Sequence, residues 1–143
     1  MTEKITESLK SMEELKIKKV PSGLEPLQLA EELVRILYEK QASDILLYHV
    51  TDTTVITDYE IICTGRASTH INALADELDF RTEDEVRTEG RDGGSWVLLD
   101  FGCVIVHIFA RDAREFYKLE RLLPEEAAVD ISDLTAPSAT ENI

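Results

Sequence analysis

Basic side chains are scarce in this 143-residue sequence: 15 Lys and Arg stand against 29 Asp and Glu, a formal net charge of -14. The first 25 residues hold five of each sign, so the deficit lies in the remainder. Proteins that bind nucleic acids directly need basic footprints that displace counterions from phosphates. The composition therefore disfavours direct nucleic-acid recognition and favours a basic protein patch as the partner.

Cysteine is nearly absent as well. Only Cys63 and Cys103 occur, each inside an apolar, β-branched run and without C-x-x-C spacing. This pattern predicts two small buried side chains in a reducing compartment, in preference to a disulfide or a metal site. No apolar run approaches the roughly 20 residues of a membrane span, and the N-terminus shows no secretory or transit-peptide pattern. We therefore expect a cytoplasmic protein with no membrane contact.

Motifs for catalysis are absent or isolated. Asp100–Gly102 spells the Asp-Phe-Gly of protein kinases, but no Gly-rich loop or catalytic-loop motif accompanies it, and a hairpin turn explains it at least as well. Residues 65–68 stand where phosphate loops occur, but contain one Gly and no Lys. Asp58 and Glu60 alternate on one predicted strand and form the only arguable carboxylate pair for a metal. The sequence predicts a protein that is not an enzyme and holds neither cofactor nor metal.

Histidine and tryptophan are also few, and each stands alone. His49, His70 and His107 lack the i, i+4 pairing or carboxylate spacing of a metal site. A hydrogen-bonded histidine in the core or on a sheet face is the favoured interpretation of His107, with a contribution to a binding face as the alternative. Trp96, the only Trp, follows a Gly-Gly turn at a predicted strand start, a position compatible with either the core or an interface hot spot.

Hydrophobic periodicity predicts an α/β domain with a five-stranded mixed sheet flanked by helices. The predicted strands lie at 44–50, 59–64, 86–89, 95–101 and 103–109, and the last two form a hairpin joined at Gly102. A first helix is predicted at 26–40, and a second is capped by Ser68 or Thr69 and carries the apolar stripe Ile71, Leu74, Ala75 and Leu78. A last helix begins with an Asp112–Glu115 capping box and continues through Phe116, Leu119 and Leu123.

Composition divides the chain into three parts. Residues 1–24 form a leader, either helical or flexible, that ends at Pro21-Ser22-Gly23. Residues 25–123 form the single domain. Residues 124–143 are predicted to be an acidic, disordered tail, because they offer little apolar surface to bury.

Five separated blocks carry a resemblance to a known family. They are Thr57–Gly65, Glu89-Gly90, Trp96–Gly102, Val104–Phe109 and Arg114–Leu122. In this order they resemble the Iojap, or ribosomal silencing factor S, family over about residues 26–123. The chain departs from the family pattern in a shorter segment at 79–88, in Leu123 where a Trp is common, and in Cys103 where an Asp is usual.

The resemblance implies a fold and a function. Members of this family have an α/β domain with a five-stranded mixed sheet, similar in outline to nucleotidyltransferases but without their catalytic carboxylates. They bind protein fourteen of the large ribosomal subunit, block joining with the small subunit, and lower translation when nutrients are scarce. By motif position, the resemblance nominates Trp96 as the leading partner contact, followed by Asp100, His107, Arg114 and Tyr117.

Two alternatives stand beside a ribosome-binding factor. One is a structural role in assembly of the large subunit, with a monomer or a homodimer as the free state, since organellar relatives assist such assembly. The other is an enzyme related to nucleotidyltransferases. The isolated carboxylate pair and the missing phosphate loop disfavour the enzyme.

Overall fold

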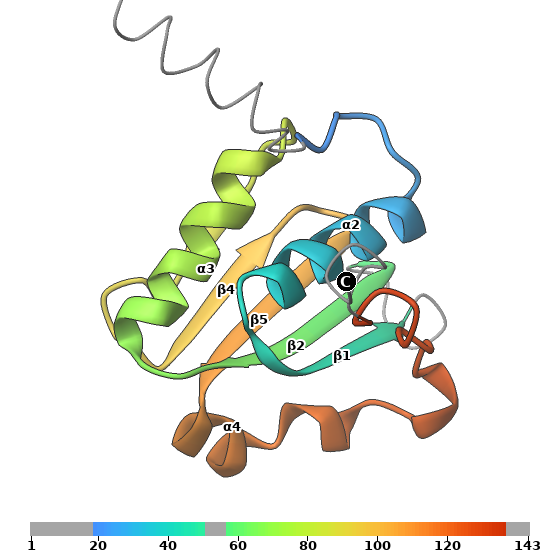
Figure 1. Cartoon of the computed structure of the whole chain (residues 1–143). Helices are drawn as coiled ribbons and strands as arrows, with labels where there is room; N and C mark the ends of the chain where they lie inside the picture. Colours follow the sequence, from blue (N-terminus) through green and yellow to red (C-terminus); the bar gives the residue numbers. More distant parts are fainter. Residues whose placement is uncertain (1–18, 51–56, 137–143) are drawn as a thin grey trace, which may run out of the picture.

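The computed structural model describes residues 19–50 and 57–136 of the chain (Figure 1). Its elements, in chain order, are α2 (Pro26–Glu39), β1 (Ser43–His49), β2 (Tyr59–Gly65), α3 (Ser68–Arg81), β3 (Arg87–Glu89), β4 (Trp96–Asp100), β5 (Val104–Ala110), α4 (Arg111–Tyr117) and two short 3-10 helices, Leu119–Leu122 and Glu125–Ala127. The strands form one five-stranded sheet in the order β1-β2-β5-β4-β3. Only β2 and β5 run parallel, so the predicted mixed sheet is confirmed.

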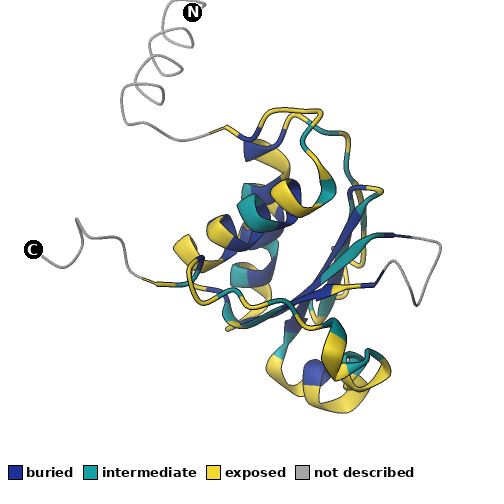
Figure 2. Ribbon diagram, turned by 90° about the vertical axis from the view of Figure 1, so that its right-hand side faces the viewer, coloured by how far each residue is buried: buried dark blue, intermediate teal, exposed yellow. Residues whose placement is uncertain are grey.

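Helices α2 and α3 lie side by side over one face of the sheet (Figures 1 and 2). Pro26 occupies the first turn of α2, where its missing N–H costs nothing, and Gln28 Oε1 accepts the Glu25 N–H at 3.1 Å. Apolar side chains at helical spacing, among them Leu33 and Leu37, are fully buried beneath α2. The stripe of α3 that was predicted from the sequence, Ile71 to Leu78, is likewise buried.

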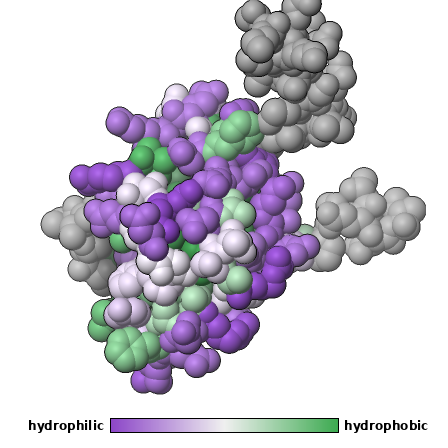
Figure 3. Space-filling model, turned by 90° about the vertical axis from the view of Figure 1, so that its left-hand side faces the viewer, coloured by the Kyte–Doolittle hydropathy of each residue, from purple (hydrophilic) through white to green (hydrophobic). Residues whose placement is uncertain are grey.

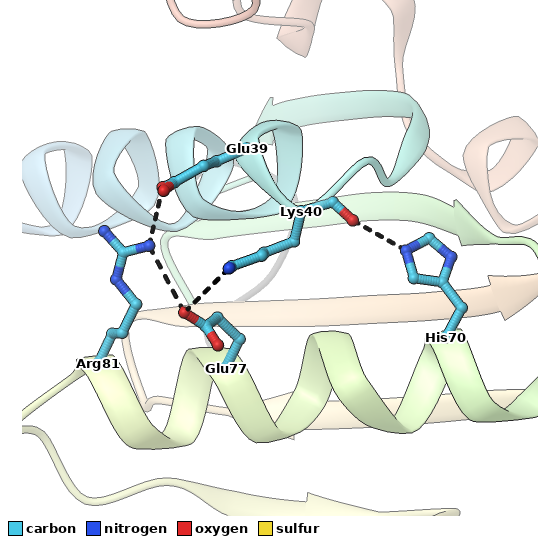
Figure 4. Close-up of polar contacts among 5 residues, drawn as sticks. All are labelled: Glu39, Lys40, His70, Glu77 and Arg81. Carbon is cyan, nitrogen blue, oxygen red and sulfur yellow. Dashed lines mark hydrogen bonds and ion pairs between the residues drawn. The ribbon is translucent and has the colours of Figure 1, made fainter. Parts of the chain in front are cut away.

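A polar network joins the C-terminal end of α2 to side chains spread along α3, from His70 to Arg81 (Figure 4). The Arg81 guanidinium lies 2.8 Å from the Glu39 carboxylate and 3.7 Å from that of Glu77. Lys40 reaches Glu77 at 3.9 Å, and its carbonyl is 2.9 Å from His70 Nε2. Because the Arg81 side chain is only 8% exposed, its charge is stabilised by these two carboxylates in place of water.

Part of the segment predicted to be a disordered tail is packed against the sheet. Val129 donates its N–H to the Leu47 carbonyl at 2.8 Å, and Leu134 is buried among the side chains beneath α2. Composition predicts whether a segment can fold alone, but it does not reveal that the outer edge of β1 offers backbone partners. The prediction is therefore wrong for 124–136, while 137–143 lie outside the described residues.

The leader also reaches the domain at its end. Val20 is 1% exposed and donates its N–H to the Arg81 carbonyl at 2.7 Å. Residues 1–18 lie outside the described part of the chain. The domain boundary therefore precedes the predicted position by several residues.

Three predictions about helix ends are wrong. Ala67 and Ala110 occupy the N-cap positions of α3 and α4, and neither helix has a side-chain cap. Asp112 accepts only the adjacent Ala113 N–H. Helix α4 ends at Tyr117 because Lys118 takes a left-handed conformation with φ +47°, and the chain continues as a 3-10 helix.

Within the described ranges, no helix is both long and apolar enough to cross a membrane.

Candidate protein-binding face

The second face of the sheet carries alternate side chains of β2, β4 and β5. Val97 and Leu99 of β4 point toward the helices and are fully buried, so Trp96, Leu98 and Asp100 point to the opposite side. Strand pairing sets Trp96 against Phe109, Leu98 against His107, and Asp100 against Ile105. Glu60, Ile62 and Thr64 of β2 continue these rows across β5.

Among the described residues, α4 and the segment after it cover one end of this second face. There, α4 and the segment after it lay Ala113, Leu119, Leu123 and Ala127 over Ile62 and Phe109. Figure 2 shows the sheet nearly on edge, with α2 and α3 on one side and the short C-terminal helices at the lower end of the other. The remainder, around Trp96 and Leu98, is half exposed.

Aromatic rings gather at the boundary between the covered and the open parts. The Trp96 ring lies 4.8 Å from Phe109, 4.9 Å from Tyr117 and 5.9 Å from His107, between centroids. Phe116 packs edge-on against Tyr117 at 5.1 Å. Phe109 and His107 are buried, whereas Tyr117 is 52% and Phe116 80% exposed. We call these five residues the aromatic face. Figure 3 shows hydrophobic surface at the lower end of the molecule, where α4 lies.

A chain of hydrogen bonds fixes the Trp96 indole. Its Nε1–H donates to His107 Nδ1 at 3.2 Å, and His107 Nε2 lies 3.2 Å from Glu60 Oε1. Since an indole nitrogen can only donate, Nδ1 must be the unprotonated nitrogen of the ring. The Nε2–H then donates to the Glu60 carboxylate, so His107 is held as one neutral tautomer. Glu60 thus orients His107, and His107 orients Trp96.

Arg114 is a structural residue and not an exposed contact. It is 9% exposed, and its Nη1 donates to the Asp44 carbonyl at 2.6 Å and to Thr64 Oγ1 at 2.8 Å. Its Nε lies 3.4 Å from Glu120 Oε1. Asp44 interrupts the regular pairing of β1 with φ +50°, at the bulge between Ser43 and Leu46. The guanidinium therefore ties α4 and the 3-10 helix after it to β1 and β2.

Asp100 lies at the far end of β4 from Trp96. Its Oδ1 accepts the Gly102 N–H at 2.8 Å, and its Oδ2 is 3.4 Å from Arg87. Gly102 has φ +86°, as the tight connection between β4 and β5 requires. The interpretation of Asp100–Gly102 as a hairpin turn is confirmed, and the structure does not bring Asp100 into the aromatic face.

The metal ligands and thiols considered from the sequence can be placed in the structure. Among the described residues, no three His, Cys, Asp or Glu side chains are placed to hold a metal ion. Burial raises the pKa of Cys63 to about 12 and also raises the pKa of Cys103, so both remain thiols near neutral pH. The Glu60 carboxylate is engaged by His107.

Three members of the site were not nominated from the sequence. Glu60 was considered only as a metal ligand, Phe109 only as part of a strand, and Phe116 only as part of a helix. The alternation of β2 and β5 places Glu60 and His107 on outward positions of their strands, but only the order of the strands shows that β2 is the neighbour of β5.

Comparison with known proteins gives a consistent result. Residues 24–142 match a family model described as "Ribosomal silencing factor during starvation". A relative from Haemophilus influenzae named "Ribosomal silencing factor RsfS" is 40% identical over 103 residues, which cover 67% of this chain and 98% of the relative. A mouse protein named "Mitochondrial assembly of ribosomal large subunit protein 1" is 32% identical over 97 residues, 63% of this chain and 42% of that protein.

The solved structures include the same fold. The crystal structure of protein CV0518 from Chromobacterium violaceum superposes with a TM-score of 0.67 at 23% identity. The superposition covers 79% of this chain and 100% of that protein. This likeness concerns the fold alone.

Replacing Arg114 should destabilise the domain. Arg114→Met leaves Thr64, the Asp44 carbonyl and Glu120 without their donor, so the free energy of unfolding should fall by about 2–4 kcal/mol. Arg111→Met, an exposed position on the same helix, is the control and should change it by about 0.5 kcal/mol or less. Urea denaturation measures both, and equal stability of the two variants would contradict the role given to Arg114.

Removing His107 should release the indole of Trp96. With a single Trp in the chain, its side-chain N–H gives one NMR signal whose exchange with water can be followed. His107→Leu should accelerate this exchange by about 2- to 12-fold, the equivalent of one net hydrogen bond of roughly 0.5–1.5 kcal/mol. Glu60→Gln keeps an acceptor for His107 and should leave the rate near that of the native chain. An unchanged rate in His107→Leu would show that the bond does not hold the ring.

Proposed function

This chain belongs to the ribosomal silencing factor family, and we propose that it binds the large ribosomal subunit through ribosomal protein fourteen. The bound chain then occupies the volume that the small subunit needs, so that the two subunits cannot join. It acts in the cytoplasm, under nutrient limitation, and without catalysis. Steric exclusion requires only a stable complex in the right place, and no nucleophile, base or metal.

The observation that carries this proposal is the aromatic face, which lies where α4 meets the open part of the sheet. Trp96 and Tyr117 combine a large apolar area with few rotatable bonds, which is typical of residues that dominate binding energies. Phe116 extends the same surface and is 80% exposed. An exposed ring of this size is costly in water unless a partner covers it.

Preorganisation of Trp96 favours tight binding. Its ring is stacked on Phe109 and hydrogen-bonded to His107, which Glu60 orients in turn. Little side-chain entropy therefore remains to be lost when a partner contacts the ring. His107 contributes to the proposed contact by holding Trp96, and Arg114 by holding α4 with Tyr117 in place.

The charge of the chain suits a basic protein partner. At -14, its field attracts a positively charged surface over distances of about one Debye length, roughly 8–10 Å at physiological salt. Such attraction mainly raises the association rate, whereas the buried aromatic contact determines how long the complex lasts. The two features complement one another.

A role in assembly of the large subunit is the second candidate. The name of the mouse relative states this role for that protein. An assembly factor could use the same aromatic face for binding. The two functions differ in the particle that the chain binds. An assembly factor would co-sediment with precursors of the large subunit, whereas a silencing factor would co-sediment with mature subunits.

Co-sedimentation on sucrose gradients, combined with one substitution, tests the proposal. The native chain should co-sediment with free large subunits and lower the fraction of joined ribosomes. Trp96→Ala should weaken binding by about 2 kcal/mol, roughly 30-fold in Kd. Phe80→Ala is the matched control, because Phe80 is a 44% exposed aromatic on α3, away from the proposed face.

Association with small subunits alone would rule out the proposed function. Equal affinities of Trp96→Ala and Phe80→Ala would show that the aromatic face is not the contact.

A further inference from the structure

Most basic side chains in the described residues have a partner, eight of the eleven. Six of the eleven form ion pairs with carboxylates: Arg35, Lys40, Arg81, Arg87, Arg91 and Arg114. Lys19 lies over the Phe80 ring, and Arg66 donates to the Gln41 side chain. Arg111, Lys118 and Arg121 are the three that remain, with no ion pair or hydrogen bond from the side chain to any described residue.

These three cations surround one hollow. It measures about 430 Å³ and lies beside the end of β2, with Leu46 and Thr64 among its lining residues. All three cations are exposed. Helix α4 supplies Arg111, the 3-10 helix supplies Arg121, and Lys118 lies at the turn between them. We call this site the cationic hollow.

The backbone around the cationic hollow is unusual. The described residues contain three non-glycine positions with positive φ, and two of them, Asp44 and Lys118, line this hollow. Such conformations cost of order 1 kcal/mol or more each and persist where the surrounding structure imposes them. At Lys118 the left-handed turn is what brings Arg121 back to the same hollow as Arg111.

The absence of partners for these cations is informative because carboxylates are so abundant. With 29 acidic and 15 basic residues, an acidic neighbour is readily available to any cation. Three carboxylates line the hollow, those of Asp44, Glu115 and Glu120. Glu120 is paired with Arg114, so Asp44 and Glu115 remain. Three cations thus face two carboxylates, a local surplus of positive charge on a strongly acidic chain.

We infer that the cationic hollow contacts backbone phosphates of the large-subunit RNA. This rests on the proposed function, because on the ribosome the anion that surrounds any bound protein is RNA. Phosphate oxygens are well matched to guanidinium and ammonium donors. Leu122, the residue after Arg121, is 77% exposed and offers apolar surface nearby for a ribose or a base.

The contact would be local and independent of base sequence. The acidic composition led us to expect no direct nucleic-acid recognition. A net charge of -14 disfavours an extended RNA-binding surface, but it does not disfavour a single cationic site. The aromatic face would then bind protein, and the adjoining end of α4 would bind RNA.

Salt dependence of binding to purified large subunits tests this inference. The native chain is compared with the triple variant Arg111→Gln, Lys118→Gln and Arg121→Gln. Each lost phosphate contact should reduce the slope of log Kd against log salt concentration by about 0.7–0.9, so the triple variant should lose about 2–3 units of slope. Circular dichroism confirms that both proteins are folded.

Two controls make the result decisive. The variant Arg35→Gln, Lys40→Gln and Arg91→Gln removes the same charge from paired cations on the helix side and should keep the native slope. Isolated ribosomal protein fourteen should bind the native chain and the hollow variant equally. A native slope in the hollow variant, equal losses in both triple variants, or weakened binding to the isolated protein would each overturn the RNA contact. Failure of the native chain to bind large subunits at all would instead refute the proposed function.

Discussion

The Arg114 guanidinium is the interaction on which the second face of the sheet depends. From α4 it reaches the Asp44 carbonyl on β1, the Thr64 hydroxyl on β2 and the Glu120 carboxylate on the following 3-10 helix. One planar group therefore ties α4 and the 3-10 helix after it to β1 and β2, which lie 70 and 50 residues away in the sequence. Its bond to the Thr64 hydroxyl is buried and is therefore protected from competition with water.

The contacts of Arg114 determine where the side chains of α4 lie on the second face of the sheet. With α4 fixed over one end of the sheet, Tyr117 lies against Trp96, and Phe116 extends the exposed apolar area. The same placement gathers the unpaired cations around the cationic hollow on the other side of α4. No described helix covers the rest of this face, since α2 and α3 both lie on the opposite side of the sheet. The packed helices and the proposed binding surface therefore lie on opposite faces of the sheet.

The helices and strands were largely predictable from the sequence because their apolar residues follow the periods of regular structure. The stripe of α3, the β4–β5 hairpin around Gly102 and even the three-residue β3 are present close to the predicted positions. Trp96 begins β4, as was expected from the Gly-Gly turn before it, and it is half-buried. The resemblance to the family, and not periodicity, supplied the expected partner.

What could not be predicted depends on contacts between distant segments. Arg114 looked like a surface residue because nothing local shows that Asp44 and Thr64 accept its hydrogen bonds, 70 and 50 residues away. The order of the strands decides that Glu60 meets His107. The sequence predicted one helix through Phe116, Leu119 and Leu123. In the structure the left-handed Lys118 ends the helix after Tyr117, and the Phe116 ring is exposed.

The central claim is that the open half of the sheet, and not the helical layer, faces the ribosomal partner. Amide hydrogen exchange of the chain, measured with and without isolated ribosomal protein fourteen, tests it most directly. The account predicts slower exchange in peptides spanning β4, β5 and α4, with α2 and α3 unchanged. Protection confined to α2 and α3 would contradict it.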